Sequence, residues 1–340
     1  MTDINTNSEE HNVDQEAKYW MVRTMGGRYY KNFSDDGYIA LGYNEIDLKS
    51  INALPRDLKV SKLALDTIVK DRLDSSDEKE ERNIGYISSM ILKFCMEMKK
   101  GDYVIIPSYS SKLINIGIIA GETYEYTGPA ITGAKQCDFK KRRPIQWLKV
   151  MPKSSMHPAI QLMMTSRHPI TDIGDYARYI DSTLKDFYIK NNESNLILRI
   201  DTKEEIKMTD FFGLYKLLEL SEKICAENGF DDKANDVSIK VLMESPGVVH
   251  LIAKTAKILF AAGLLTVCLT GGGLNIDSIG LDLSTKGLIE SISNYMDRKE
   301  DRAIKESIKQ SLDSLQIRTP QDLETSIKLL NTINKTRNSY

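Results

Sequence analysis

The sequence predicts an α+β fold for its first half and an α/β to mostly helical second domain. The chain has 340 residues, of which 41% are hydrophobic and 28% are charged, which is enough for about two globular domains. Short runs of branched and aromatic residues, typical of strands, surround one strongly periodic helix before residue 153. After residue 195 the predicted order is strand, helix, strand and helix, followed by further helices.

The first sixteen residues are polar and acidic, with five acids and no base. This composition predicts a disordered tail over residues 1–16 and no secretory leader. The four cysteines form no CxxC pair and lie far apart in the chain. We therefore expect a protein of the reducing cytoplasm.

The first folded domain is expected over residues 17–153. Apolar residues between Ile84 and Met98 recur at steps of three and four, which predicts a helix that ends before Gly101. Another helix is expected over Ser61–Leu73. Four strands are predicted from branched and aromatic runs bounded by Gly or Ser: Trp20–Arg23, Tyr38–Leu41, Tyr103–Ile106 and Leu113–Ile119.

Residues 154–194 contain two His-Pro steps and are expected to be a linker with a short helix over Gly174–Tyr188. Residues 195–340 form the second predicted domain. Its expected elements are a strand from Leu196, a helix over Met208–Glu227, a strand over Val237–Met243, an apolar helix after Ser245-Pro246-Gly247, and two helices near Ile304–Leu315 and Pro320–Ile333.

One uncharged stretch of nineteen residues, Ile258–Ile276, approaches the ~17 residues that can cross a bilayer. Its predominantly apolar part is shorter, Ile258–Leu269, and a run of glycines follows. A buried core helix that ends at the glycines is one interpretation of this pattern. A segment that inserts into a membrane is the other.

Positive charge is concentrated in one segment although the formal net charge of the chain is −2. Residues 135–153 contain seven bases and one acid. Such a run can follow a phosphate backbone, whereas a solvated strand edge protected by lysines is the alternative. The residues expected to contact phosphate are Lys140, Lys141, Arg142, Arg143 and Lys149.

Six short motifs occur in order along the first domain. They are Trp20-x-x-Arg23, Gly26-Gly27-Arg28, Gly37 to Tyr43, Phe94 to Val104, Ile116 to Tyr126, and Arg143-Pro144-Ile145-Gln146-Trp147-Leu148. Over about residues 19–150 the chain resembles the N-terminal domain of many Mrr-like and McrB-like restriction proteins. That domain is a member of the PUA-like group, which includes the EVE and YTH domains.

The resemblance implies a small, curved β-barrel with helices packed on it. It also implies a pocket that encloses a modified base between aromatic rings, where stacking and a few polar contacts read the base. The residues expected at this pocket are Trp20, Tyr43 and Trp147 as aromatic rings and Arg23 as a polar contact. Tyr43 departs from the family, which often has Trp after the glycine, so the resemblance implies a pocket of different size and a different preferred modification.

No catalytic motif stands out, so we expect no enzyme, no metal and no cofactor. The chain has neither a GxSxG motif nor an HExxH motif. Glu205-Ile206-Lys207 has the Glu-x-Lys form of metal-dependent nucleases, with Asp181, Asp186 and Asp201 upstream. Glu205 and Lys207 on a solvated turn are the simpler interpretation.

These observations favour a cytoplasmic sensor in a bacterial antiviral defence system, whose first domain binds DNA that is modified or unpaired. The second domain is then an effector or oligomerisation module, and a homo-oligomer is consistent with it. One alternative is a membrane-acting effector whose first domain senses a nucleotide or another small molecule. A metal-dependent nuclease is the third hypothesis.

Overall fold

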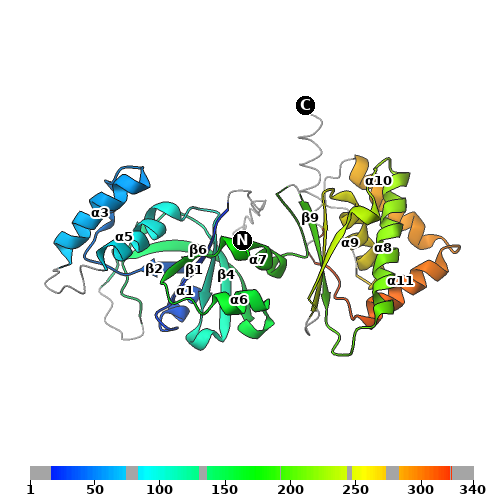
Figure 1. The fold of residues 1–340 in the computed structure, drawn as a ribbon, viewed down its shortest axis with the longest axis horizontal. Coiled ribbons are helices and arrows are strands. Elements are labelled where there is room, and N and C mark those ends of the chain that lie inside the picture. The colour runs from blue at the N-terminus through cyan, green and yellow to red at the C-terminus, as the bar shows by residue number, and fades with distance from the viewer. Residues whose placement is uncertain are drawn as a thin grey trace, which may run out of the picture. The chain divides into compact units, whose positions relative to one another are not determined.

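The computed structural model describes residues 17–73, 83–129, 136–191, 193–242, 247–272, 283–321 and residue 323. The chain forms two compact units (Figure 1). We call Glu16–Ile180 the N-terminal unit and the described residues from Asp181 onward the C-terminal unit. The expected tail (residues 1–16), the turn residues Ser245 and Pro246 and most of the last predicted helix lie outside the described residues.

A mixed sheet that curls into a half-barrel forms the centre of the N-terminal unit. Strands β1 and β3 are parallel, with Tyr19 opposite Tyr103, and the other neighbouring pairs are antiparallel. The strands lie in the order β2 (Tyr38–Leu41), β6 (Lys141–Pro152), β4 (Leu113–Ile119), β3 (Tyr103–Pro107), β1 (Tyr19–Val22) and β7 (Ile170–Asp172), and β5 (Tyr124–Glu125) also pairs with β6. The expected α+β architecture is confirmed.

Helices pack on this sheet and close its core. The helix predicted between Ile84 and Met98 is present in two parts, α5 (Ile84–Leu92) and a π-helical turn (Lys93–Glu97). Asp57 starts α3 because its carboxylate accepts hydrogen bonds from the backbone N–H groups of Lys59 and Val60. The other helices are α1 (Tyr30–Asp35), α2 (Leu48–Asn52), α3 (Leu58–Arg72) and α6 (Pro158–Met163).

The segment expected to be a linker, residues 154–194, is instead built into the two units. Strand β7 pairs with the buried strand β1, and Ile170 is part of the apolar core beneath it. Further on, α7 (Ala177–Leu184) leads to β8 (Phe187–Lys190), which pairs with the next strand of the C-terminal unit. The pairing of these two short strands therefore corrects the predicted linker.

The C-terminal unit has an antiparallel sheet with helices gathered on one face (Figure 1). The strand order is β10 (Ser238–Leu242), β11 (Gly247–Ala253), β9 (Glu193–Ile200) and β8. Strand β11 occupies residues expected to begin an apolar helix, because the branched residues after Gly247 alternate between buried and half-buried positions. The helices are α8 (Met208–Glu227), α9 (Lys257–Leu269), α10 (Leu283–Asp297) and α11 (Arg302–Ser314).

Helix α9 is the core of the C-terminal unit. Between Ile258 and Leu269 every residue except Cys268 is buried, and α8, α10, α11 and the sheet pack around it. A helix that is apolar on all sides is typical of such a buried position. Among the described residues no helix is long and apolar enough to span a bilayer. The end of the uncharged stretch, residues 273–276, lies outside the described part of the chain.

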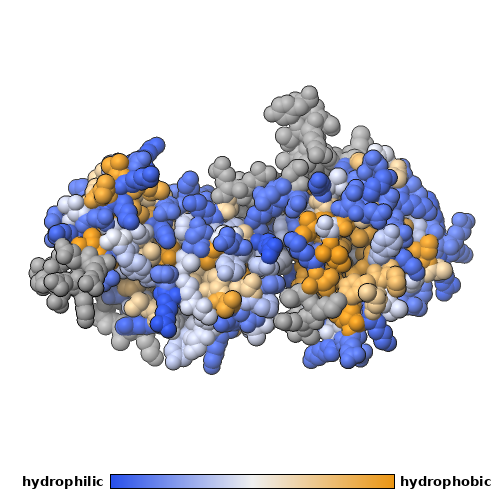
Figure 2. All heavy atoms as spheres, in the orientation of Figure 1, coloured by the Kyte–Doolittle hydropathy of each residue, from blue (hydrophilic) through white to orange (hydrophobic). Residues whose placement is uncertain are grey.

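Some apolar side chains lie on the surface, outside the cores of the two units. On the face in Figure 2 they gather over α3 and over the sheet of the C-terminal unit. The large apolar residues exposed on α3 are Leu58, Val60 and Leu63, and those on β10 are Ile239 and Val241. Strand β10 lies at an edge of its sheet, and the exposed Lys240 between the two apolar residues protects that edge from pairing with other strands.

Candidate functional site

Three of the five cations expected on the surface lie inside the N-terminal unit. Lys141, Arg142 and Arg143 begin strand β6, and their exposed fractions are 1%, 7% and 0%. A side chain that is buried to this degree cannot reach a phosphate group from outside. The expectation that these three residues contact phosphate is therefore corrected.

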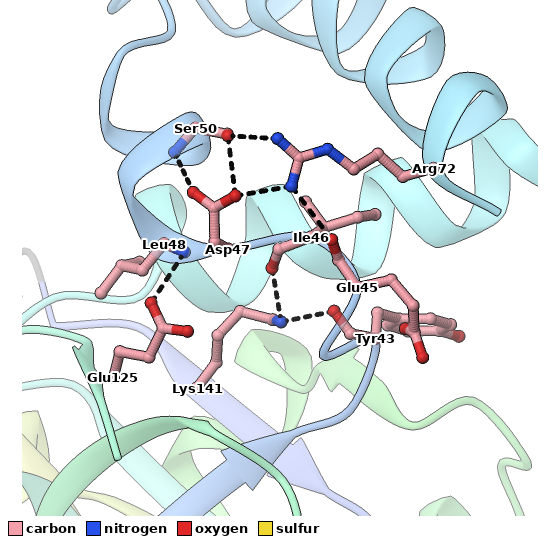
Figure 3. A network of polar contacts seen from close by, with 9 residues as sticks. All are labelled: Tyr43, Glu45, Ile46, Asp47, Leu48, Ser50, Arg72, Glu125 and Lys141. Carbon is pink, nitrogen blue, oxygen red and sulfur yellow. Dashed lines mark hydrogen bonds and ion pairs between the residues drawn. The ribbon is translucent and has the colours of Figure 1, made fainter. Parts of the chain in front are cut away.

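Lys141 is held by backbone carbonyls from the segment before α2 (Figure 3). Its Nζ donates hydrogen bonds to the carbonyl oxygens of Tyr43, at 2.6 Å, and Ile46, at 2.9 Å. Burial lowers the pKa of Lys141. Next to this contact, Asp47 accepts from the backbone N–H of Ser50 and from Arg72, so α2 and α3 are tied to each other. Lys141 thus fastens the helical segment to the sheet.

Arg143 fastens the π-helical turn to the same strand. Its guanidinium donates to the carbonyl oxygens of Phe94, Cys95 and Gly121, at 2.7, 3.2 and 3.1 Å. Burial lowers the pKa of Arg143. These bonds satisfy carbonyl groups from two other parts of the chain. The role of Arg143 in this structure is to hold the fold together.

Arg142 lies between two aromatic rings. Its guanidinium carbon is 4.3 Å from the ring centre of Tyr38 and 3.9 Å from that of Tyr126. It also donates to the carbonyl oxygens of Cys137 and Phe139. Stacking on both faces and hydrogen bonding at the edge leave this cation occupied by the protein itself.

The other bases of the segment lie closer to solvent. Lys140 and Lys149 are exposed, and Lys153 is half-buried. The backbone N–H of Lys153 donates to the carbonyl of Lys112, so the end of β6 lies beside the start of β4. Lys135 lies outside the described residues. The exposed positive charge of this segment therefore lies on either side of the buried start of β6, at Lys140 before it and at Lys149 in its far half.

The three aromatic residues expected to form a pocket belong to the core or pack against it. Trp20 is buried, and its Nε1 donates to Oδ2 of Asp102 at 2.8 Å. Trp147 is half-buried and donates from Nε1 to the carbonyl of Phe33. Tyr43 is half-buried with a φ of 60° and packs on the same core. None of the three lines the cavity of the N-terminal unit that contains Arg23.

That cavity lies between the loop after β1 and the loop after β3. Its volume is about 260 Å³, slightly below the roughly 300 Å³ at which pockets for drug-sized ligands begin. It therefore suits a group smaller than a whole nucleotide. The lining residues are Arg23, Thr24, Gly26, Gly27, Pro107, Ser108, Tyr109, Ser110 and Ser111.

Contacts between the two loops give the cavity a fixed shape. Thr24, which is buried, donates from Oγ1 to the carbonyl of Pro107 at 2.6 Å. Gly27 has a φ of +98°, and a Cβ atom there would lie 2.3 Å from the Cα of Tyr109. Only glycine allows the two backbones to approach so closely. The cavity wall is therefore built from two loops in direct contact.

Arg23 supplies the one charged side chain in the lining, counted over the residues that the structure describes. Its Nη2 donates to the carbonyl oxygens of Met164 and Ser166, and burial lowers its pKa. Its Nε is buried and has no hydrogen-bond partner among the described residues. Arg23 is thus a fixed cation beside the cavity with an unused donor.

The chemistry of the lining suits a small polar group that carries acceptors. Three serine hydroxyls and one guanidinium are donors, and the Tyr109 ring offers a flat surface. Exposed cations follow directly in the chain: Arg28 after Gly27, Lys112 after Ser111, and Arg167 after Ser166. An anionic backbone attached to the bound group would meet positive charge on leaving the cavity.

Of the residues predicted from sequence, Arg23 alone lines this cavity. The loop Ser108–Ser111 was missed, although Pro-Ser-Tyr-Ser-Ser between two predicted strands is a signal that could have indicated it. Binding groups concentrate in loops that connect strands. Packing of the core does not explain an aromatic residue that is flanked by serines in such a loop.

The carboxylates considered for a nuclease are engaged in separate ion pairs. Asp181 pairs with Lys190 at 2.7 Å, Asp186 with Arg199 at 2.7 Å, and Asp201 with Arg318 at 2.8 Å. Glu205 and Lys207 are exposed. In the parts of the chain that the structure describes, no three metal-binding side chains come together. The structure does not assemble the predicted nuclease residues into one site.

One region of the chain matches a known protein family, and the cavity residues lie within it. Residues 19–171 match a family described as a domain of unknown function (DUF8426). No curated protein and no solved structure matches the chain. The matched region runs from the start of β1 into β7 and so includes both cavity loops.

Proposed function

We propose that the N-terminal unit is a PUA-like reader of DNA that takes one base, with modified bases as the preferred target, into the cavity beside Arg23. The cavity between the two loops is the observation that carries this proposal. Its size suits one base better than a whole nucleotide, and its donors match the acceptors on a base edge. The curled mixed sheet and the order of the six sequence motifs support the PUA-like character.

In this proposal the exposed cations near the two cavity loops contact the phosphates. Arg28 and Lys112 follow the cavity residues directly, and Lys153 donates its backbone N–H to the carbonyl of Lys112. Lys149 is exposed on the same half of β6. Cations that surround a base-sized cavity supply the sequence-independent part of binding, which depends on salt concentration.

The C-terminal unit is assigned the role of an effector or oligomerisation module in an antiviral defence system. A homo-oligomer remains part of this proposal, and the exposed apolar side chains of Ile239 and Val241 on β10 are the feature that favours it. The DNA-bound N-terminal unit would then be the sensor, and the second unit would carry the response.

Binding of oligonucleotides to the full chain tests the proposed function. We expect the protein to bind strands that contain cytosine, 5-methylcytosine, 5-hydroxymethylcytosine or glucosylated cytosine with different affinities. The substitution Arg23→Gln is expected to remove this difference. Lys112→Gln should reduce the slope of log K against log salt by about 0.9, because one phosphate contact is lost.

Lys62→Gln is the matched control, because Lys62 is exposed on α3 and has no place in the cavity. It should leave both the affinities and the salt slope unchanged. If the wild-type chain binds none of these strands, or if Lys62→Gln and Lys112→Gln change the salt slope equally, the proposed function is rejected.

A further inference from the structure

Tyr109 is an aromatic residue of the cavity lining whose ring is exposed to solvent. The exposed fraction of Tyr109 is 72%, compared with 42% for Tyr124 and 36% for Tyr86. An exposed aromatic ring adds nothing to the stability of the core, since its apolar surface stays in water. Because Tyr109 also lines the cavity, its exposed ring is available to a ligand that binds there.

The backbone that carries Tyr109 is fixed at both ends of its loop. The backbone N–H and carbonyl of Ser108 are bonded to the loop itself: Ser108 N–H donates to the carbonyl of Leu113 at 2.8 Å, and Ser111 N–H donates to the carbonyl of Ser108 at 2.9 Å. The hydroxyl of Ser108 accepts from Leu113 N–H at 2.8 Å. On the other side, the Tyr109 backbone lies against Gly27. The backbone that carries the ring is thus held in place before a ligand binds.

Strain in the same loop supports a functional reason for its shape. Ser110 and Ser111 both have a φ of 53°, the left-handed region that residues other than glycine seldom adopt. Both residues follow Tyr109 directly in the chain, and all three line the cavity. Unfavourable backbone conformations of this kind persist where the surrounding structure fixes them, and they cluster at binding sites.

Extraction of a base from a duplex leaves a gap in the stack of bases. Proteins that rotate a nucleotide out of a duplex need to offset this loss, and an inserted flat or apolar side chain does so. Tyr109 has three properties that suit this role: it lines the cavity, its ring is exposed, and its backbone is fixed by contacts of the loop. Arg28 and Lys112, on the two loops, can contact the phosphates on either side of the gap.

We propose that Tyr109 is a wedge that fills the space in duplex DNA left by the base that enters the cavity. This inference rests on the proposed function. It gives Tyr109 a role in binding duplex DNA that the binding of single-stranded DNA does not need. In an unpaired strand there is no gap to fill, because the base enters the cavity without leaving a partner.

The test compares a 5-methylcytosine duplex with the same modified strand alone, each bound to the full chain. For Tyr109→Ala we expect about a tenfold loss of affinity for the duplex and a loss of less than about threefold for the single strand. A 2-aminopurine placed beside the modified base reports unstacking through its fluorescence, and this signal should weaken in Tyr109→Ala.

Two further variants separate the wedge from other effects. Tyr109→Phe keeps the ring and should bind like the wild-type chain. Tyr124→Ala is the matched control and should also bind like the wild-type chain, because Tyr124 is an exposed tyrosine that does not line the cavity. Equal losses for duplex and single strand, or no loss for either, would overturn the wedge while leaving the proposed function intact. If the wild-type chain binds neither form, the proposed function itself fails.

Discussion

The indole Nε1 of Trp20 donates a hydrogen bond of 2.8 Å to Oδ2 of Asp102, which joins β1 to the turn before β3. The same carboxylate accepts from the backbone N–H of Lys99 and, through Oδ1, from that of Lys18, each at 3.0 Å. Asp102 is buried. One side chain therefore satisfies three donors around the parallel pair of strands.

We expect Asp102→Ala to lower the free energy of unfolding of the N-terminal unit by about 3 kcal/mol. Three donors would remain in place without the charged acceptor, and buried donors without partners are costly. Urea unfolding followed by tryptophan fluorescence measures this loss, since Trp20 lies at the site. Asp102→Asn keeps the shape and part of the acceptor capacity, so its loss should be smaller; an equal loss would contradict this explanation.

Arg143 and Lys140 are two cations near the start of β6 that differ in burial. Arg143 is buried and Lys140 is exposed. Arg143→Gln should lower the free energy of unfolding by about 3 kcal/mol, because the carbonyls of Phe94, Cys95 and Gly121 lose a charged donor. Lys140→Gln should change it by less than about 0.5 kcal/mol. Similar effects of the two substitutions on unfolding would show that Arg143 is not the structural cation described above.

Buried thiols predict a loss of stability at alkaline pH. Burial raises the pKa of Cys225 to about 12, and those of Cys95 and Cys137 to about 11, from 9.0 for an ordinary thiol. The folded chain then binds more protons than the unfolded chain above pH 9. Stability contributed by these thiols is complete below pH 9 and is lost as the pH rises toward 11 for Cys95 and Cys137 and toward 12 for Cys225.

Cys225→Ala isolates one of these contributions, since Cys225 lies in the core of the C-terminal unit. Between pH 8.5 and 11, under reducing conditions, the free energy of unfolding should fall less steeply with pH for this variant than for the wild-type chain. Lys141 acts in the opposite direction, because burial lowers its pKa, but it does so in both proteins. Identical slopes would contradict the assignment.

Two glycines in helices are expected to respond oppositely to alanine. At Gly213 in α8 a Cβ atom would lie 2.1 Å from the hydroxyl oxygen of Ser311 in α11. Gly213→Ala should therefore destabilise the C-terminal unit by about 1–3 kcal/mol. At Gly85 in α5 no atom lies within 4 Å, so Gly85→Ala should raise stability by up to about 1 kcal/mol. Thermal unfolding of both variants tests the contrast.

The regular elements of the N-terminal unit were predictable from local pattern. The ranges Tyr38–Leu41 and Leu113–Ile119 coincide with β2 and β4, because branched and aromatic residues bounded by turns indicate strands directly. The element after Gly247 was not predictable in this way. An apolar run of that length suits a buried strand and a buried helix equally, and sheet pairing decides between them.

The fate of the basic segment could not be predicted because it depends on distant partners. A run of seven bases indicates an exposed patch, yet three of them are buried. Lys141 and Arg143 donate to carbonyl groups from remote parts of the chain, and Arg142 lies over the distant ring of Tyr38. Arg23 was identified as a site residue, and it lines the cavity. The second wall, formed by Ser108–Ser111, depends on the approach of Gly27 to Tyr109, which no local pattern contains.

The parallel pairing of β1 with β3 determines when the N-terminal unit can begin to fold during synthesis. Tyr19 and its partner Tyr103 are 84 residues apart in the chain, that is, 103 minus 19. At about 5–20 residues per second, a ribosome needs roughly 4 to 17 s to supply β3 after β1 has been made. Throughout that interval four residues that end up fully buried, Tyr19–Val22, have no strand to pair with. During synthesis these apolar side chains are therefore exposed to contact with other chains until β3 is complete, which is the stage at which aggregation competes with folding.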